Sequence, residues 1–120
     1  MPKSTPAGWY PKRGEIYLVE VHAGGQAKWR PFLVISIDPL NRRALDVCVV
    51  PITSIEHREF RMRVPIPPRE AGLDKPSWAK CDQVTTLEKK WLSYPPIGTL
   101  TGQPVLKEIE NQVRFALGLV

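Results

Sequence analysis

Cysteine and histidine are scarce in this sequence of 120 residues. The two cysteines, Cys48 and Cys81, are too few for a disulfide scaffold and show no CxxC or Cys/His metal spacing. We expect both to behave as small buried hydrophobic residues of a protein in a reducing compartment. The two histidines, His22 and His57, fall in expected loops, where a histidine is either a general base or simply solvated.

Long apolar runs and common cofactor motifs are missing too. Residues 1–15 contain no apolar segment typical of a signal peptide, and no run approaches the roughly 20 residues of a membrane helix. There is no P-loop, GxGxxG, HExxH or GxSxG motif, and no carboxylate cluster at metal spacing. We therefore expect a cytoplasmic protein without a membrane segment, whose chemistry uses no cofactor and no metal.

Proline, in contrast, is abundant, with 13 residues. Helix interiors exclude proline, so this composition favours many short strands joined by turns over a helical bundle. Residues 1–12 contain three prolines and no periodicity, which predicts a flexible N-terminal tail. Residues 13–120 have the ordinary mixture of a globular domain, with no repeat or linker. We expect them to form a single domain.

The apolar patterning predicts a mainly β (α+β) protein. Two nearly continuous apolar runs indicate buried strands, and clean alternation over Arg61–Ile66 indicates a half-exposed or edge strand. A turn is expected at 38–41 and one or two helical turns at 86–92. The expected strands are Glu15–Val21, Phe32–Ile37, Leu45–Ile52, Arg61–Ile66, Ser77–Val84 and Ile97–Leu100. They suit a small antiparallel β-barrel.

The last segment predicts an amphipathic helix that begins at Pro104 and is capped by Gly118. Proline tolerates the first helical turn, and glycine tolerates the left-handed cap. Apolar residues fall on one stripe at helical spacing and charged residues on the other. The apolar stripe consists of Leu106, Ile109, Val113, Ala116 and Leu117, and the charged face of Lys107, Glu108, Glu110 and Arg114.

Several polar residues at expected strand ends are candidates for catalysis. Arg30 precedes a buried strand, where a guanidinium can bind a phosphate through two hydrogen bonds or pair with a carboxylate. Thr53 and Ser54 follow another strand, and their hydroxyls either face an oxyanion or belong to a polar turn. Lys80 and Asp82 share one strand face, as an acid–base pair or a salt bridge.

Basic and aromatic residues are candidates for nucleic-acid binding. The formal charge of +5 suits a polyanion or an acidic protein, or is merely a solvated basic surface. Trp29 and Trp78 either stack on bases of a single strand or belong to the core or an interface. An electrostatic track, or a solvated face, is expected from a group of residues near His57: Arg58, Arg61, Arg63 and Arg69.

Four segments in order resemble the MazF/PemK (Kid) toxins of type II toxin–antitoxin modules. The first is Lys12–Tyr17 (KRGEIY), followed after Gln26 by Arg30–Ser36 (RPFLVIS). Val50–Ser54 (VPITS) is similar to the family's strand end, and Asp82–Leu87 (DQVTTL) to its D-Q stretch. The resemblance spans roughly residues 12–119. Each motif is short, and their shared order and spacing carry the comparison.

The resemblance implies a homodimeric, SH3-like β-barrel with helices, a fold shared with CcdB gyrase poisons. It implies metal-independent, sequence-specific cleavage of single-stranded RNA, usually mRNA, by attack of a ribose 2′-OH on the adjacent phosphate. The products are a 2′,3′-cyclic phosphate and a 5′-OH, and the result is inhibited translation and growth.

The family's catalytic arginine and strand-end threonine fall on Arg30 and Thr53, and its residues before D-Q fall on Lys80 and Asp82. We expect the RNA to contact Gln26, Trp29, Ser54, Arg58, Arg61, Arg63, Trp78 and Gln83. Two positions depart from the family pattern, since Gly25 replaces a loop glutamate and Lys80 replaces an arginine.

The resemblance also implies a cognate antitoxin with an acidic, partly disordered tail, and contact with operator DNA only through that antitoxin. Two alternatives on the same fold remain open. One is a CcdB-like, non-catalytic gyrase poison that acts through its C-terminal region, and the other is a corepressor. A gyrase poison needs no Arg30 and Thr53 pair, so their presence favours RNA cleavage.

Overall fold

The computed structural model describes residues 5–56 and 61–119. Its strands form one seven-stranded sheet in the order β4-β5-β3-β2-β1-β7, with β6 paired to β3 beside this path. All of the pairings are antiparallel. The strands are β1 (Glu15–Ala23), β2 (Gln26–Val34), β3 (Asp46–Thr53), β4 (Arg63–Ile66), β5 (Ser77–Lys80), β6 (Thr85–Glu88) and β7 (Ser93–Thr99).

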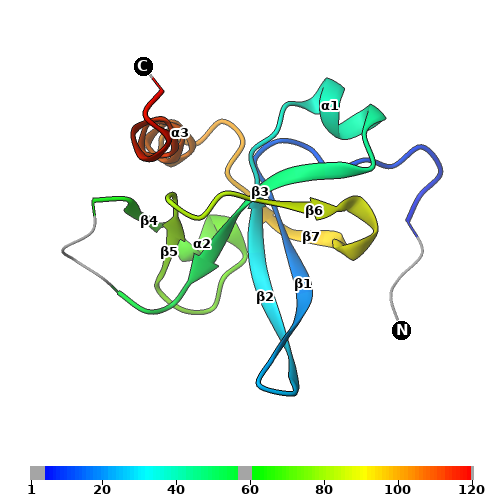
Figure 1. Cartoon of the computed structure of the whole chain (residues 1–120), viewed down its shortest axis with the longest axis horizontal. Coiled ribbons are helices and arrows are strands. Elements are labelled where there is room, and N and C mark those ends of the chain that lie inside the picture. Colours follow the sequence, from blue (N-terminus) through cyan, green and yellow to red (C-terminus); the bar gives the residue numbers. More distant parts are fainter. Residues whose placement is uncertain (1–4, 57–60, 120) are drawn as a thin grey trace.

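The sheet bends into a half-barrel because β3 changes partner along its length. Its first half pairs with β6 at residues 46–49, and its last residues, Ile52 and Thr53, pair with β5. The β1–β2 hairpin projects from the body of the molecule, and α3 (Pro104–Leu117) lies at the opposite side (Figure 1). Short helices α1 (Asp38–Arg43) and α2 (Pro68–Ala71) and a 3-10 turn, η1 (Lys89–Trp91), connect the strands.

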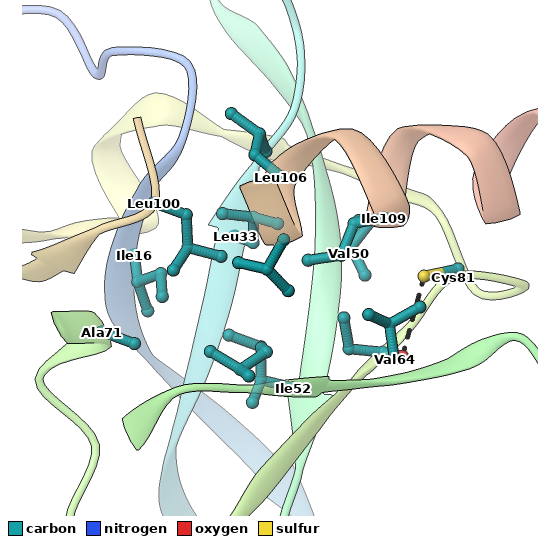
Figure 2. Packing of buried hydrophobic residues seen from close by; sticks show 13 residues of the cluster. Ile16, Leu33, Val50, Ile52, Val64, Ala71, Cys81, Leu100, Leu106 and Ile109 are labelled. Atoms are coloured by element: carbon teal, nitrogen blue, oxygen red, sulfur yellow. Dashed lines mark hydrogen bonds between the residues drawn. The ribbon is translucent and has the colours of Figure 1, made fainter. Parts of the chain in front are cut away.

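The larger core lies between the sheet and α3. Helix residues Leu106 and Ile109 reach toward Leu33 and Val50 of the central strands (Figure 2). Leu33, Val50 and Ile109 are completely buried. Strand alternation sends every second residue of β2, β3 and β5 into this core and leaves the intervening residues on the other face.

A second, smaller core lies under the N-terminal segment. Tyr17, Val34 and Val49 are completely buried in it, and Trp9 packs edge-on against Tyr17 at 5.9 Å between ring centroids. The hydroxyl of Tyr17 donates a hydrogen bond of 2.7 Å to Glu15. Burial, reinforced by this hydrogen bond to Glu15, raises the pKa of Tyr17 well above its ordinary value.

The C-terminal helix largely follows its sequence prediction. It begins at Pro104 and ends at Gly118, whose φ of 71° is the left-handed cap that glycine favours. Leu106 and Ile109 are buried as expected, but Leu117 is 55% exposed. Glu110 also differs from expectation, because it forms an ion pair with Arg13 rather than standing free in solvent.

The predicted fold class is confirmed, and several local expectations are wrong. Strand β2 spans Gln26–Val34 rather than 32–37, and β5 ends at Lys80 rather than at Val84. Residues 86–88 belong to strand β6 rather than to a helix, because pairing with β3 satisfies their backbone groups; only η1 at 89–91 is helical. The expected turn at 38–41 begins helix α1. Strand β7 begins at Ser93, before the expected Ile97, since its edge position tolerates Pro95 and Pro96.

Within the described residues no helix has the length and apolar character needed to cross a membrane. The division of the chain into a tail at 1–12 and a domain at 13–120 stays a prediction.

Candidate active site

Arg30 and Thr53 lie on the same face of the sheet. Phe32 of β2 pairs with Pro51 of β3, and this is the last pair of the ladder. Arg30 and Thr53 each lie two residues beyond it, and residues two apart on a strand share a face. The long-range pairing of β2 with β3 therefore joins two side chains that lie far apart in the sequence.

The two strands separate at this point, and their ends border an opening. The β2–β3 ladder ends at Phe32 and Pro51, so β2 continues toward the hairpin tip with β1 as its only strand partner among the described residues. Two hollows, of about 400 and 380 Å³, meet here and share Arg30, Thr53 and Ser54 in their walls. Arg30 is exposed and Thr53 is half-buried. A phosphate that enters the opening can reach both side chains.

The face that carries Arg30 and Thr53 also carries residues of β4 and β5. Thr53 pairs with Trp78. Arg63 pairs with Lys80, and Pro65 with Trp78, so both Lys80 and Arg63 lie on this same face. Lys80 lines the larger hollow together with Arg30. The register of four strands thus gathers three cations, a hydroxyl and an indole on one surface.

Asp82 lies just beyond β5 and forms an ion pair with Arg63. The Arg63 side chain is 8% exposed and that of Asp82 is 32% exposed, so the pair is largely shielded from water. Asp82 does not line either hollow beside Arg30. The carboxylate of Asp82 therefore orients the Arg63 guanidinium next to Lys80.

Cys81 lies between Lys80 and Asp82 in the sequence but points into the larger core, where it is completely buried. Burial, and secondarily the Asp82 carboxylate, raises the pKa of the Cys81 thiol to about 12. A protonated thiol is a poor nucleophile, so Cys81 acts as a core residue here.

The other expected RNA contacts are dispersed. Gln26 lies near the tip of the β1–β2 hairpin, on the same face of β2 as Arg30, whereas Trp29 projects from the opposite face. Ser54 lines both hollows, and Gln83 is exposed after β5.

The expected arginine track is divided among separate sites. Arg61 lies over the ring of Phe115 in α3, at 3.9 Å from the ring centroid, and donates a hydrogen bond to Gln112. Arg63 pairs with Asp82, and Arg69 is exposed on α2. Arg58 and His57 lie outside the described residues. The other histidine, His22, lies in β1 rather than in the expected loop and is exposed beside Glu20.

Sequence reasoning overlooked several residues around the opening. Lys28 is exposed and lies on the same face of β2 as Arg30, two residues away, which strand alternation could have indicated. Asp74 and Lys75 line the smaller hollow, but they arrive from the loop after α2. No local pattern places that loop beside β2.

The departure at Gly25 has a structural explanation. Gly24 and Gly25 join β1 to β2 in a two-residue turn between the paired residues Ala23 and Gln26. Their φ values are +59° and +78°, and such turns need positive φ at both central positions. A glutamate at position 25 would be strained in this turn.

The chemistry available at the opening is electrostatic. Arg30 and Lys80 supply positive charge, and Thr53 supplies a hydroxyl whose oxygen accepts a hydrogen bond of 3.1 Å from the Ile55 backbone. In the described part of the chain, His, Cys, Asp and Glu side chains form no group of three or more that could hold a metal ion. The arrangement suits a phosphate group that gains negative charge during a reaction.

Comparison with known proteins identifies the relatives of this chain. The model of the family described as PemK-like, MazF-like toxin of type II toxin–antitoxin system matches residues 12–117. An endoribonuclease MazF from Staphylococcus epidermidis is 30% identical over 112 residues, which cover 90% of this chain and 92% of that protein.

Solved structures show the same fold. An endoribonuclease in complex with its cognate antitoxin, from a mycobacterial species, has 27% sequence identity and a TM-score of 0.75, over 92% of this chain and 97% of that one. A MazE–MazF complex from Deinococcus radiodurans has 19% identity and a TM-score of 0.77, over 93% and 100% of the two chains. The expected barrel with a C-terminal helix is confirmed.

Proposed function

The chain belongs to the PemK-like, MazF-like toxin family of type II toxin–antitoxin systems and is an endoribonuclease toxin, and we propose that it cuts single-stranded RNA at the opening between β2 and β3. The observation that carries this proposal is that Arg30 and Thr53 project from the same face of β2 and β3, just beyond the last paired residues, where the two strands separate. The same two residues line both hollows at that point.

The reaction is attack of a ribose 2′-oxygen on the adjacent phosphorus. The P–O2′ bond forms as the P–O5′ bond breaks, and a 2′,3′-cyclic phosphate and a 5′-hydroxyl result. The 2′-hydroxyl loses one proton and the 5′-oxygen gains one, so no water, metal ion or cofactor is consumed. Negative charge collects on the non-bridging oxygens, where the Arg30 guanidinium donates two hydrogen bonds and the Thr53 hydroxyl donates one.

The neighbouring cations have supporting roles. Lys80 lines the hollow with Arg30 and adds positive charge near the leaving 5′-oxygen. Asp82 is a positioning residue, because its carboxylate pairs with Arg63 and thereby holds that guanidinium beside Lys80. The remaining side chains that we expect to contact RNA are those of Gln26, Ser54, Trp78 and Gln83.

The biological setting follows from the family. The protein acts on single-stranded RNA, mRNA above all, and a cognate antitoxin neutralises it, as the mycobacterial relative has its antitoxin bound. We infer a homodimer built from the domain at 13–120, located in the cytoplasm, where mRNA is translated. Its net charge of +5 suits both an RNA backbone and an acidic antitoxin segment.

A cleavage assay on a long, unstructured RNA in EDTA tests the proposal. Wild-type protein should give discrete fragments with 5′-hydroxyl ends, and Arg30→Ala should lower the rate by about 10²–10³ while the protein stays folded. Arg43→Ala, which removes an exposed arginine of α1, is the matched control and should cleave normally. Intact RNA with wild-type protein, or full activity of Arg30→Ala, would contradict the proposal.

A further inference from the structure

A third hollow lies beside the candidate active site, between the β1–β2 hairpin and the start of β7. It measures about 670 Å³, and its walls include Leu18, Glu20, Trp29 and Trp91. Leu18 and Trp29 also line the smaller hollow at Arg30 and Thr53. The two hollows therefore adjoin. Trp29 projects from the face opposite Arg30, so a chain bound at Arg30 reaches this hollow across the stretch of β2 that β3 leaves unpaired.

Two tryptophans line this hollow from different elements. Trp29 of β2 pairs with Glu20 of β1, and Leu18 pairs with Ser93 of β7. Trp91 ends the 3-10 turn η1, two residues before Ser93, and lines the same hollow as Trp29 and Glu20.

Two indoles in the wall of one hollow suit an aromatic ring as a ligand. Aromatic rings attract each other when stacked, and the bases of a single strand stack on such side chains. Trp29 and Trp91 are each 54% exposed, so both indoles are accessible in the single chain. Lys90 lies at 5.5 Å from the Trp91 ring and lines the same hollow, where a phosphate would follow the base.

The charges of the hollow favour a nucleotide over a second protein chain. Cores of protein interfaces are depleted in charged residues, whereas both Glu20 and Lys90 line this hollow. The Glu20 side chain is 47% exposed. A carboxylate in this position accepts hydrogen bonds from an amino group on a base edge, as Glu does from cytosine N4.

We propose that this hollow binds a nucleobase that flanks the cut, with Trp29 and Trp91 stacking on its faces and Glu20 accepting a hydrogen bond from its amino group. The proposal rests on the proposed function, because it takes single-stranded RNA as the ligand. It makes Glu20 a specificity residue that favours cytosine or adenine over uracil, which lacks the amino group.

Binding of 2′-O-methyl oligonucleotides tests this proposal apart from cleavage, since a methylated 2′-oxygen cannot attack phosphorus. Fluorescence anisotropy should show wild-type protein binding oligo-C or oligo-A more tightly than oligo-U. Trp91→Ala should weaken binding of all three by about 5- to 100-fold. Trp91→Phe should restore most of it, and Glu20→Gln should reduce the preference among the bases.

The matched control is Leu45→Ala, which removes a side chain that is 84% exposed and lies outside the hollow. It should bind as wild type does. Unchanged binding by Trp91→Ala overturns the subsite whether or not the protein cuts RNA. Binding that depends on Trp91, together with wild-type protein that leaves RNA intact, contradicts the proposed function alone. A shift in oligomeric state on Trp91→Ala, seen by light scattering, would show a contact between copies and overturn the subsite.

Discussion

The two faces of strands β2, β3 and β5 carry different kinds of side chain. One face presents Leu33, Val50 and Ile52 to the core under α3. The other buries Val34 and Val49 in the second core, and it presents Arg30 and Thr53 to the opening where β2 and β3 separate. Because strand side chains alternate, neighbouring residues such as Ile52 and Thr53 belong to different faces. The first face is therefore apolar under α3, whereas the other is apolar where the strands pair and polar where they separate.

The largest expected effect is on the core face. Ile52 is 5% exposed, and Ile52→Ala removes buried methyl and methylene groups and leaves a cavity. We expect the free energy of unfolding to fall by about 2–5 kcal/mol, as measured by urea denaturation. A normal unfolding midpoint would show that this face does not carry the stability.

The adjacent residue should show the opposite pattern. Thr53→Val keeps the shape of the side chain and removes the hydroxyl that faces the opening. We expect the cleavage rate to fall by about 10²–10³, with the unfolding midpoint lowered only slightly by loss of the hydrogen bond from the Ile55 backbone. Thr53→Ser restores the hydroxyl and should recover most of the activity. A stability loss equal to that of Ile52→Ala would erase the distinction between the two faces.

A smaller effect is expected beside the opening. Asp82→Asn removes the charge that pairs with Arg63, and we expect a cleavage loss of about tenfold that Arg63→Ala reproduces. If Asp82 were the general base instead, the loss would reach about 10²–10⁴, and the acidic limb of the pH–rate profile would change. Cleavage measured from pH 4 to 9 distinguishes a positioning residue from a base.

The hairpin that extends β2 allows a test of backbone strain. Gly25→Glu introduces the family's loop glutamate at a φ of +78°, and we expect a loss of about 1 kcal/mol in the free energy of unfolding. Gln26→Glu adds the same charge at an ordinary backbone position and should leave stability unchanged. Equal stability of the two variants in thermal denaturation would contradict a strained turn.

The smallest effect concerns Cys81, which directly follows β5 and points into the larger core. Its pKa is raised from 9.0 to about 12 by burial, so the folded state favours the neutral thiol. The contribution of this neutral thiol to the free energy of unfolding is complete below pH 9 and is lost as the pH rises toward 12. Iodoacetamide at pH 8 should therefore leave Cys81 unmodified until the protein is denatured. Rapid labelling of native protein would contradict its burial.

Much of the fold could be predicted from local patterns. The caps Pro104 and Gly118 define the C-terminal helix, and alternation at 61–66 indicates the edge strand that becomes β4. The segment at 86–88 could not be predicted, because its helical propensity is outweighed by pairing with β3. Likewise, no local signal revealed that Asp82 would pair with Arg63.

The sequence by itself determined which residues are available for chemistry and which face of each strand they occupy, because side-chain alternation depends only on the local backbone. Arg30 and Thr53 are identifiable from their positions at expected strand ends and from the family resemblance. Only the tertiary structure decided that they meet. Strand register is set by turn geometry and by burial of one face across distant segments, and it places Arg30 and Thr53 on one face where β2 and β3 separate.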